Sequence, residues 1–254
     1  MRTISSKDNR IVKLCAGLSQ KKNRDKQGLY LIEGENLLEE AVKNNAEIQT
    51  VLVRKGYEKT LWGLEDRAFM LEDKVFRSLA QTQSSQGVIA IVKKPRTDIS
   101  QFKIGNEGGN YVVLDRLQDP GNIGTILRTA DAAGYKLVIV MEGTADVFSP
   151  KVVRAATGSL FRMPVVFMAS EDELTEFVRA AGKKLVATCF DTDRYYYEEE
   201  LRSNIALIIG NEGNGISETL INRSDVKIKI PMENTESLNA SVAAGILMYE
   251  AVRR

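Results

Sequence analysis

The spacing of hydrophobic positions changes near the middle of the chain. Up to about residue 92, short apolar runs alternate between the period of a strand and the period of a helix. These alternating elements predict a small α/β sandwich of about 90 residues. The strand candidates are 30–32, 48–53 and 88–92, and the helix candidates are 36–42 and a short helix that includes Val75, Phe76 and Leu79.

Beyond residue 110 the pattern becomes a regular succession of strands and helices. Five strand candidates are apolar on both faces, which predicts a mostly parallel sheet covered by helices. Ser170 and Glu173 predict a capping box for the helix candidate 171–181. The final helix candidate, 238–252, is apolar nearly all round, so it must be buried in its own domain or against a second subunit. The remaining candidates are strands 111–114, 136–141, 185–188, 205–209 and 226–230 and helix 123–133.

A polar stretch that carries Gly105, Gly108 and Gly109 separates the two parts, and we interpret residues 95–110 as a linker. The predicted domains are therefore 1–94 and 111–254, α/β in both cases. A chain of 254 residues suits two domains of roughly 100–150 residues each. No apolar run approaches the ~20 residues of a membrane span, and the first residues lack the apolar core of a secretory signal. We therefore expect a cytoplasmic protein without a membrane partner.

The composition limits the available chemistry. The chain contains no histidine, which excludes Ser-His-Asp and Cys-His nucleophiles, His-rich zinc sites and the commonest near-neutral base. Cys15 and Cys189 are far apart without metal-ligand spacing, so we interpret them as small buried apolar residues. We therefore predict no metal site. Reactive groups must come from carboxylates, amides, hydroxyls, Lys, Arg, Tyr and the backbone.

Positive charge is concentrated at the N-terminus. The net charge of the chain is only +1, yet residues 1–28 contain eight Lys or Arg residues and two acids. Such a basic arm on a near-neutral body is typical of contact with a polyanion. A solvated basic helix explains the charge equally well, so both interpretations stay open.

Three polar segments follow predicted strands, where ligands of open parallel sheets bind. In the first, 115–128, Pro120-Gly121 turns the chain, and Asn122 is placed to cap the next helix, with Arg128 two turns further on. In the third, 231–243, Ser237 and Asn239 are also possible caps. Taken singly, both segments favour the structural interpretation.

The second segment, 210–216, carries three glycines around Glu212. Glycines let a backbone approach a ligand closely. Their spacing, Gly-x-x-Gly-x-Gly, is the reverse of the dinucleotide fingerprint, and no Walker-type Gly-Lys-Ser/Thr is present. An ordinary NAD or ATP site is therefore disfavoured, although the segment holds more glycine than a turn needs.

Together the three segments resemble the motifs of the SpoU family within the SPOUT (TrmH-like) RNA methyltransferases. The likeness covers about residues 110–254, and the segment 151–160 also resembles the family. The N-terminal part more loosely resembles the L30e-like substrate-binding domain of these enzymes, through residues 9–13, Lys21-Lys22 and 30–35. The motif residues are Asn122, Gly124 and Arg128 in the first segment, Gly210, Glu212, Gly213 and Gly215 in the second, and Pro231, Ser237, Leu238, Asn239 and Ser241 in the third.

The resemblance implies an S-adenosylmethionine-dependent RNA 2′-O-ribose methyltransferase that acts on large-subunit (23S) rRNA rather than tRNA. It also implies a sheet tied in a deep C-terminal trefoil knot, a cofactor held in that knot, and a homodimer formed through the C-terminal domain. Three rivals remain: a tRNA 2′-O-methyltransferase, a non-catalytic rRNA-binding protein of the same fold, and a base methyltransferase of the same superfamily. The last of these shares the knot but lacks this trio of motifs.

The resemblance also implies roles for individual residues. Arg128 would lie at the reacting hydroxyl, although a guanidinium is effectively always protonated. It could act as a base if the substrate phosphate and Asn122 rearrange its hydrogen bonds, or it could stay charged and stabilise the developing alkoxide. The implied catalytic set is Arg128, Asn122, Glu212, Ser237 and Asn239. The implied cofactor-binding set is Thr188, Gly210, Asn211, Gly213, Ile230, Met232, Leu238 and Asn239, and the implied RNA-binding set is Arg10, Lys13, Lys21, Lys22, Arg24 and Arg154.

A run of three tyrosines, 195–197, precedes three glutamates, 198–200. The tyrosines could form a base-stacking platform. Because the acidic run would repel RNA, we favour a surface loop packed by one or two of the tyrosines.

Overall fold

The structure, a computed structural model, describes residues 1–82, 84–102 and 108–253. Residues 103–107 of the predicted linker, with Gly105, therefore lie outside the described residues. By internal contacts the chain divides into two units, Met1–Pro95 with Asp146–Phe161 and Arg96–Ala145 with Arg162–Arg254. The predicted domain boundaries stay a prediction, and each unit is described by itself.

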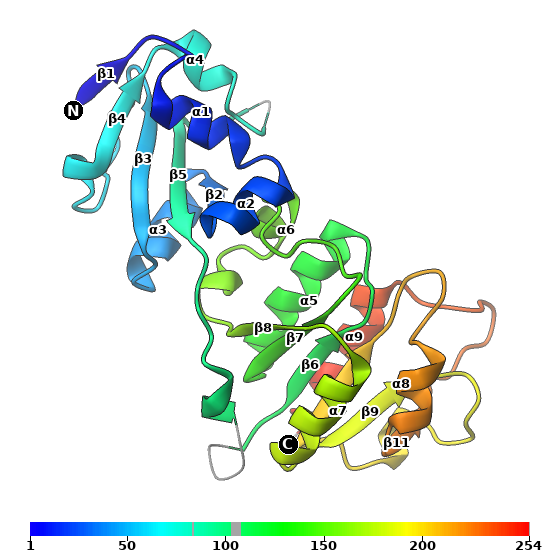
Figure 1. Cartoon of the computed structure of the whole chain (residues 1–254). Helices are drawn as coiled ribbons and strands as arrows, with labels where there is room; N and C mark the ends of the chain where they lie inside the picture. The colour runs from blue at the N-terminus through cyan, green and yellow to red at the C-terminus, as the bar shows by residue number, and fades with distance from the viewer. Residues whose placement is uncertain (83, 103–107, 254) are drawn as a thin grey trace. The chain divides into compact units, whose positions relative to one another are not determined.

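The first unit is built on a five-stranded mixed sheet in the order β1-β4-β3-β5-β2 (Figure 1). β4 runs parallel to β1 and β3, whereas β5 runs antiparallel to β3 and β2. The strand predictions for 30–32, 48–53 and 88–92 are confirmed, but β1 and β4 were not predicted. The strands are β1 (Arg2–Ile4), β2 (Leu29–Glu33), β3 (Ile48–Arg54), β4 (Ala68–Leu71) and β5 (Val88–Lys93).

Five α-helices lie among the described residues of this unit, and the last of them comes from the inserted segment 146–161. That helix packs against β2. Beside it the ring of Phe148 contacts that of Tyr30, with centroids 5.1 Å apart. The sequence interpretation leaves this segment in the second domain, whereas here it covers part of the first sheet. The helices are α1 (Arg10–Gly17), α2 (Lys21–Gln27), α3 (Glu35–Lys43), α4 (Asp73–Arg77) and α6 (Pro150–Ala155).

The second unit contains a six-stranded sheet in the order β11-β9-β10-β6-β7-β8, in which every neighbouring pair is parallel. The predicted mostly parallel sheet is confirmed, and β8 is an additional edge strand. β11 ends two residues earlier than predicted. The strands are β6 (Tyr111–Leu114), β7 (Leu137–Met141), β8 (Val165–Met168), β9 (Lys184–Thr188), β10 (Ile205–Ile209) and β11 (Val226–Ile228).

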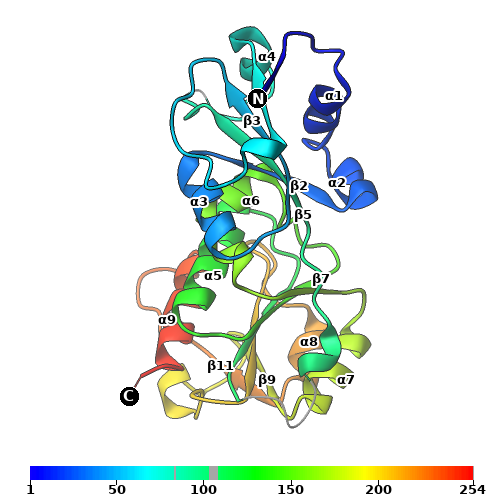
Figure 2. The same cartoon turned by 90° about the vertical axis from the view of Figure 1, so that its left-hand side faces the viewer.

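Helices cover both faces of this sheet (Figure 2). The first pair, α7 and α8, contributes Leu174, Phe177 and Leu220 to one hydrophobic core. The second pair, α5 and α9, lies on the other face, and the two helices pack against each other. The helices are α5 (Pro120–Ala132), α7 (Glu171–Ala180), α8 (Glu218–Arg223) and α9 (Ala240–Glu250).

The terminal helix α9 is buried on one side only. Ala244, Leu247 and Met248 are fully buried, whereas Val242 and Tyr249 are 51% and 53% exposed. The sequence predicted burial within the domain or against a second subunit, and the structure shows the first for one side of the helix. None of the helices described is both long and apolar enough to cross a membrane.

Candidate active site

All three polar segments lie at the carboxyl ends of parallel strands, after β6, β10 and β11 (Figure 1). β6 and β10 are direct neighbours in the sheet, and β11 is separated from β10 by β9. Loops at this edge of an open parallel sheet form its usual ligand site. The fold therefore brings the three segments to the same edge.

Asn122 is not the helix cap that the sequence suggested. Asp119 caps α5, and its carboxylate accepts from the backbone N–H of Asn122 at 2.8 Å. Pro120 takes the first helical position, where its missing N–H and fixed φ are tolerated. Asn122 therefore lies inside the first turn, 8% exposed, and its side-chain amide is free to contact the other segments.

The second segment forms a tight loop, residues 210–217, which we call the glycine loop. Asn211 and Gly215 exchange two backbone hydrogen bonds of 3.0 and 2.9 Å, and the Asn211 carboxamide oxygen accepts from Gly213 N and Asn214 N. A Cβ on Gly210 would lie 2.3 Å from Ile216 N. Only glycine therefore permits this close approach of the backbone to itself.

Glu212 connects the glycine loop to the first segment. Its carboxylate accepts from Asn122 Nδ2 at 3.1 Å and from the backbone N–H groups of Gln118 and Asp119 at 3.1 and 3.0 Å. Burial alone would raise the pKa of this carboxyl. The hydrogen bonds from Asn122, Gln118 and Asp119 outweigh burial, so the pKa lies below its ordinary value of 4.5.

Asn239 joins the third segment to the same group. It caps α9, because its Oδ1 accepts from Ser241 N at 2.9 Å and Val242 N at 3.3 Å. Its Nδ2 donates to Asn122 Oδ1 at 2.9 Å. Asn122 thus accepts from Asn239 and donates to Glu212, and this chain of three side chains, Glu212–Asn122–Asn239, joins all three segments.

Arg128 lies outside this chain of side chains. It is exposed on α5, six residues after Asn122, which places it about 120° around the helix from that residue at 3.6 residues per turn. Its guanidinium makes no hydrogen bond or ion pair with any described residue. Ser237 is also exposed, and the structure places neither residue in contact with the Glu212–Asn122–Asn239 group.

The other cofactor candidates surround the loops at this sheet edge. Ile230, Met232 and Leu238 are half-buried apolar residues in the third loop, and Thr188 is half-buried at the end of β9. Apolar side chains beside exposed loop backbone suit a ligand with an aromatic ring and an aliphatic part. These apolar side chains and the loop backbone beside them therefore fit a nucleoside-type cofactor such as S-adenosylmethionine.

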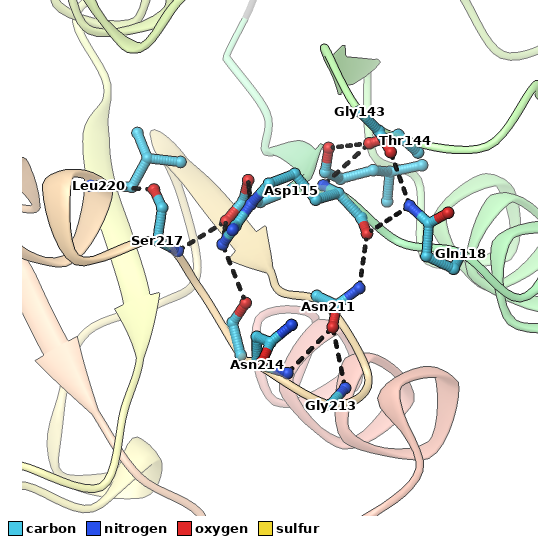
Figure 3. Close-up of polar contacts among 12 residues, drawn as sticks. Asp115, Gln118, Gly143, Thr144, Asn211, Gly213, Asn214, Ser217 and Leu220 are labelled. Atoms are coloured by element: carbon cyan, nitrogen blue, oxygen red, sulfur yellow. Dashed lines mark hydrogen bonds and ion pairs between the residues drawn. The ribbon is translucent and has the colours of Figure 1, made fainter.

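Sequence reasoning missed a buried carboxylate beside these loops, Asp115. It is 3% exposed and contacts both Arg116 and Ser217 (Figure 3). The available signal was an acidic residue directly after a strand that is apolar on both faces.

Four of the six predicted RNA-binding residues, Arg10, Lys13, Lys21 and Lys22, are exposed on α1 and α2. Arg24 is different, because it is 3% exposed and its guanidinium donates to Asp146, Leu18 O and Ser19 O. A buried guanidinium held by these acceptors is not available to a phosphate, so we remove Arg24 from the RNA surface.

The sixth, Arg154, is half-buried on α6. Among the described residues nothing accepts a hydrogen bond from its Nη1.

The tyrosine loop packs against itself. The rings of Tyr195 and Tyr197 stack with centroids 5.4 Å apart, and the ring of Tyr196 meets that of Tyr197 edge-on at 5.1 Å. Glu198 and Glu199 are engaged locally, by Tyr195 N and Arg194. This arrangement favours the surface-loop interpretation.

A cavity of about 620 Å³, lined by Phe102, Tyr111, Tyr135 and Arg162 among others, lies at the amino ends of β6 and β7, opposite the three segments.

Within the described residues, no group of three or more His, Cys, Asp or Glu side chains could hold a metal ion.

Comparison with known proteins gives matches over nearly the whole chain. The profile of the SpoU rRNA Methylase family matches residues 109–249, and that of the MRM3-like substrate binding domain matches residues 9–90. The Bacillus subtilis 23S rRNA (guanosine(2553)-2′-O)-methyltransferase RlmP is 36% identical and covers 98% of both chains. A 23S rRNA (uridine(2479)-2′-O)-methyltransferase of Streptomyces viridochromogenes is 33% identical, over all of this chain and 92% of its own length.

Solved structures give the same result. An S-adenosylmethionine-bound rRNA methyltransferase from Sinorhizobium meliloti superposes with a TM-score of 0.89 at 32% identity, over 98% of this chain and 97% of the other. The SpoU methyltransferase AviRb from Streptomyces viridochromogenes, also with S-adenosylmethionine, gives a TM-score of 0.86 at 32% identity, over 96% of this chain and 97% of the other.

Proposed function

The chain belongs to the SpoU rRNA methylase family, and from this premise we propose its substrate, its assembly and the roles of its site residues. The protein is an RNA 2′-O-ribose methyltransferase, and its methyl donor is S-adenosylmethionine. The substrate that we propose is 23S rRNA, on which the two curated relatives act. The observation that carries the proposal is the Glu212–Asn122–Asn239 chain, because a non-catalytic binder would not need three motifs joined in this way.

When bound, the cofactor supplies an activated methyl group on a sulfonium. The ribose hydroxyl is a poor nucleophile and must lose its proton as the new bond forms, so alignment and proton handling are the main contributions of the protein. We assign alignment to Asn122 and Glu212. Arg128 is the residue assigned to the hydroxyl, either as its base or as a charged group that stabilises the alkoxide.

The cofactor-binding set is assigned to the sheet edge at which the glycine loop and the third segment lie. Gly210, Asn211 and Gly213 offer loop backbone that a cofactor can approach closely. Ile230, Met232 and Leu238 provide half-buried apolar contact. Thr188 and Asn239 complete the proposed cofactor lining, and Ser237 is assigned to the catalytic set.

The fold of each part is proposed in finer detail as well. We assign residues 1–94 to an L30e-like substrate-binding domain, which the match to the MRM3-like substrate binding domain supports. The RNA would meet Arg10, Lys13, Lys21 and Lys22 there, with Arg154 as a further contact. For residues 111–254 we propose the trefoil knot of the SPOUT enzymes. The contact of Asn239 with Asn122, 117 positions away, brings the end of the chain back to α5, the helix after the first strand of this sheet, which is compatible with the proposed knot.

We further propose a homodimer in the cytoplasm. A SpoU enzyme that modifies ribosomal RNA must meet its substrate where ribosomes are made. The exposed apolar side of α9, formed by Val242 and Tyr249 and continued by Val252 just after the helix, is the surface that a second copy of the chain would cover.

The proposed function is tested by mapping ribose methylation of total RNA in cells with and without the protein. One 23S rRNA position should lose its methyl group when the protein is absent. A changed tRNA position with intact 23S rRNA would favour the tRNA alternative. Titration of the purified protein with S-adenosylmethionine tests cofactor binding separately, because a ligand that binds only the folded state must raise the melting temperature. The absence of a shift would favour the non-catalytic binder.

The variant Arg128→Ala tests the role assigned to Arg128 at the ribose hydroxyl. Arg128 is exposed and unpaired among the described residues, so its removal should leave folding unaffected. We expect turnover to fall by roughly 10²- to 10³-fold, the effect of losing one transition-state donor. The S-adenosylmethionine affinity measured by calorimetry should stay within about twofold. Equal losses of affinity and turnover would contradict the assigned role.

A further inference from the structure

The buried carboxylate of Asp115 lies at the end of β6, outside the three motifs. Its Oδ2 accepts from Ser217 N at 2.8 Å, and Arg116 donates to both oxygens through Nε and Nη2 at 2.9 and 3.1 Å (Figure 3). A buried charge is tolerated only when it is paired and hydrogen-bonded, and here both oxygens are satisfied. Ser217 N is the last amide of the glycine loop, so Asp115 fixes the end of that loop.

Arg116 holds the beginning of the same loop. Its backbone adopts φ +56°, a left-handed conformation that costs energy for a residue with a side chain and is concentrated at functional sites. The conformation lets the Arg116 carbonyl accept from Asn211 Nδ2 at 2.8 Å and from Gln118 Nε2 at 3.0 Å. Its guanidinium also reaches Gly215 O at 3.4 Å.

Both ends of the glycine loop are thus tied to two adjacent residues after β6. Between these two anchors, Glu212 extends to the first segment and holds Asn122. A displacement of the anchors would therefore move the backbone of Gly210–Gly215 and the side chain of Glu212 together. In the proposed function the loop backbone binds the cofactor, and Glu212 takes part in alignment together with Asn122.

We propose that Asp115 and Arg116 are positioning residues that keep the glycine loop in its cofactor-binding conformation. The inference rests on the proposed function, because it assumes that this loop holds S-adenosylmethionine. Neither residue is assigned a contact with the cofactor or the RNA. Both act through Asn211 and Ser217.

The test measures S-adenosylmethionine binding by calorimetry in the full-length protein. In Asp115→Asn the amide oxygen can still accept from Ser217 N, but the ion pair with Arg116 is lost. Asp115→Ala loses both interactions. We expect Kd to rise about tenfold in Asp115→Ala, the ratio for loss of a hydrogen bond to a charged group, and by less in Asp115→Asn. Arg116→Lys, which retains one donor for the carboxylate, should bind more tightly than Arg116→Ala.

Steady-state kinetics distinguish positioning from a general loss of stability. The KM for S-adenosylmethionine should rise with Kd in the Asp115 variants, whereas a partly unfolded sample lowers kcat without changing KM. The matched control is Asp131→Asn. It removes another Asp–Arg pair of the same unit, in which Arg162 donates to Asp131 at 2.9 and 2.7 Å. This control should keep the wild-type Kd even if its melting temperature falls.

Different results would contradict the proposed function and the positioning role of Asp115. If the wild-type protein binds no S-adenosylmethionine, the proposed function itself fails. If the wild type binds it and Asp115→Ala binds equally well, only the positioning role is overturned. The same conclusion follows if Asp131→Asn weakens binding as much as Asp115→Asn does.

Discussion

At the scale of single residues, the conformation of the glycine loop depends on the absence of a Cβ atom at Gly210. A Cβ there would lie 2.3 Å from Ile216 N and 2.4 Å from the Gly215 carbonyl carbon, both backbone atoms. A Cβ on Gly213 would meet only the Asn211 side chain, at 3.6 Å. The same substitution should therefore have very different effects at two positions of one loop.

We expect Gly210→Ala to weaken S-adenosylmethionine binding at least tenfold more than Gly213→Ala, because only the first forces the backbone to move. Calorimetric titration of both purified variants measures the difference. Equal affinities would show that the loop tolerates displacement and that its conformation is not what the cofactor requires.

Glu212 predicts a pH dependence of stability at the same scale. Hydrogen bonds lower its pKa on folding, so the charged carboxylate stabilises the folded state above its unfolded pKa, and this contribution is lost as the pH falls through the lower folded pKa. The difference in unfolding free energy between the wild type and Glu212→Gln should be largest above the ordinary pKa of 4.5 and shrink as the pH falls below it. Urea titrations across this range measure it. A difference that grows on acidification would contradict the direction of the pKa shift.

The role of a residue was predictable where its hydrogen-bonding partner is close in the sequence. It was not predictable where the partner is distant in the sequence. Pro120 was the available signal that Asp119, rather than Asn122, caps α5, because proline favours the first helical position. Nothing in the basic arm distinguishes Arg24 from Lys22. The burial of Arg24 depends on Asp146, 122 positions away.

At the scale of elements, α9 combines a structural cap with a site contact. Asn239 caps the helix with Oδ1 and holds Asn122 with Nδ2. Ser170 caps α7 in the same unit without a contact to the site. Loss of either cap should cost about 1 kcal/mol.

Asn239→Ala and Ser170→Ala should therefore lose similar stability in chemical unfolding, but only Asn239→Ala should lose turnover. Asn239→Ser is the decisive variant, because serine still caps a helix but is too short to replace the Nδ2 contact. It should retain most of the stability and lose activity. Full activity in Asn239→Ser would show that the contact with Asn122 is dispensable.

The elements themselves followed the hydrophobic pattern wherever both faces of a strand are buried. β6, β7, β9 and β10 were predicted within one residue of their bounds, since their central positions are apolar and buried. β8 was missed because it is a four-residue edge strand whose Phe167 is 57% exposed. The sheet edge with the three motifs was thus predictable from the sequence, whereas the Asp115–Arg116 anchors needed the fold.

At the scale of the whole molecule, the exposed side of α9 predicts assembly. Val242 and Tyr249 are seven residues apart and so lie on one side of the helix. We expect Tyr249→Arg with Val242→Arg to reduce the mass measured by light scattering from that of a dimer to that of a monomer. Phe167→Arg, at an exposed phenylalanine of β8, should leave the dimer intact. A wild-type protein that is already monomeric would contradict the proposed assembly.

The segment Asp146–Phe161 bears on how such a protein can change over evolutionary time. It belongs to the first unit, yet it is encoded between β7 and β8 of the second. A recombination event at residue 95 would leave Tyr30 without Phe148 and Arg24 without Asp146. An exchange of residues 1–95 alone would therefore break two contacts inside the first unit. We expect a working exchange to carry the segment Asp146–Phe161 along with residues 1–95.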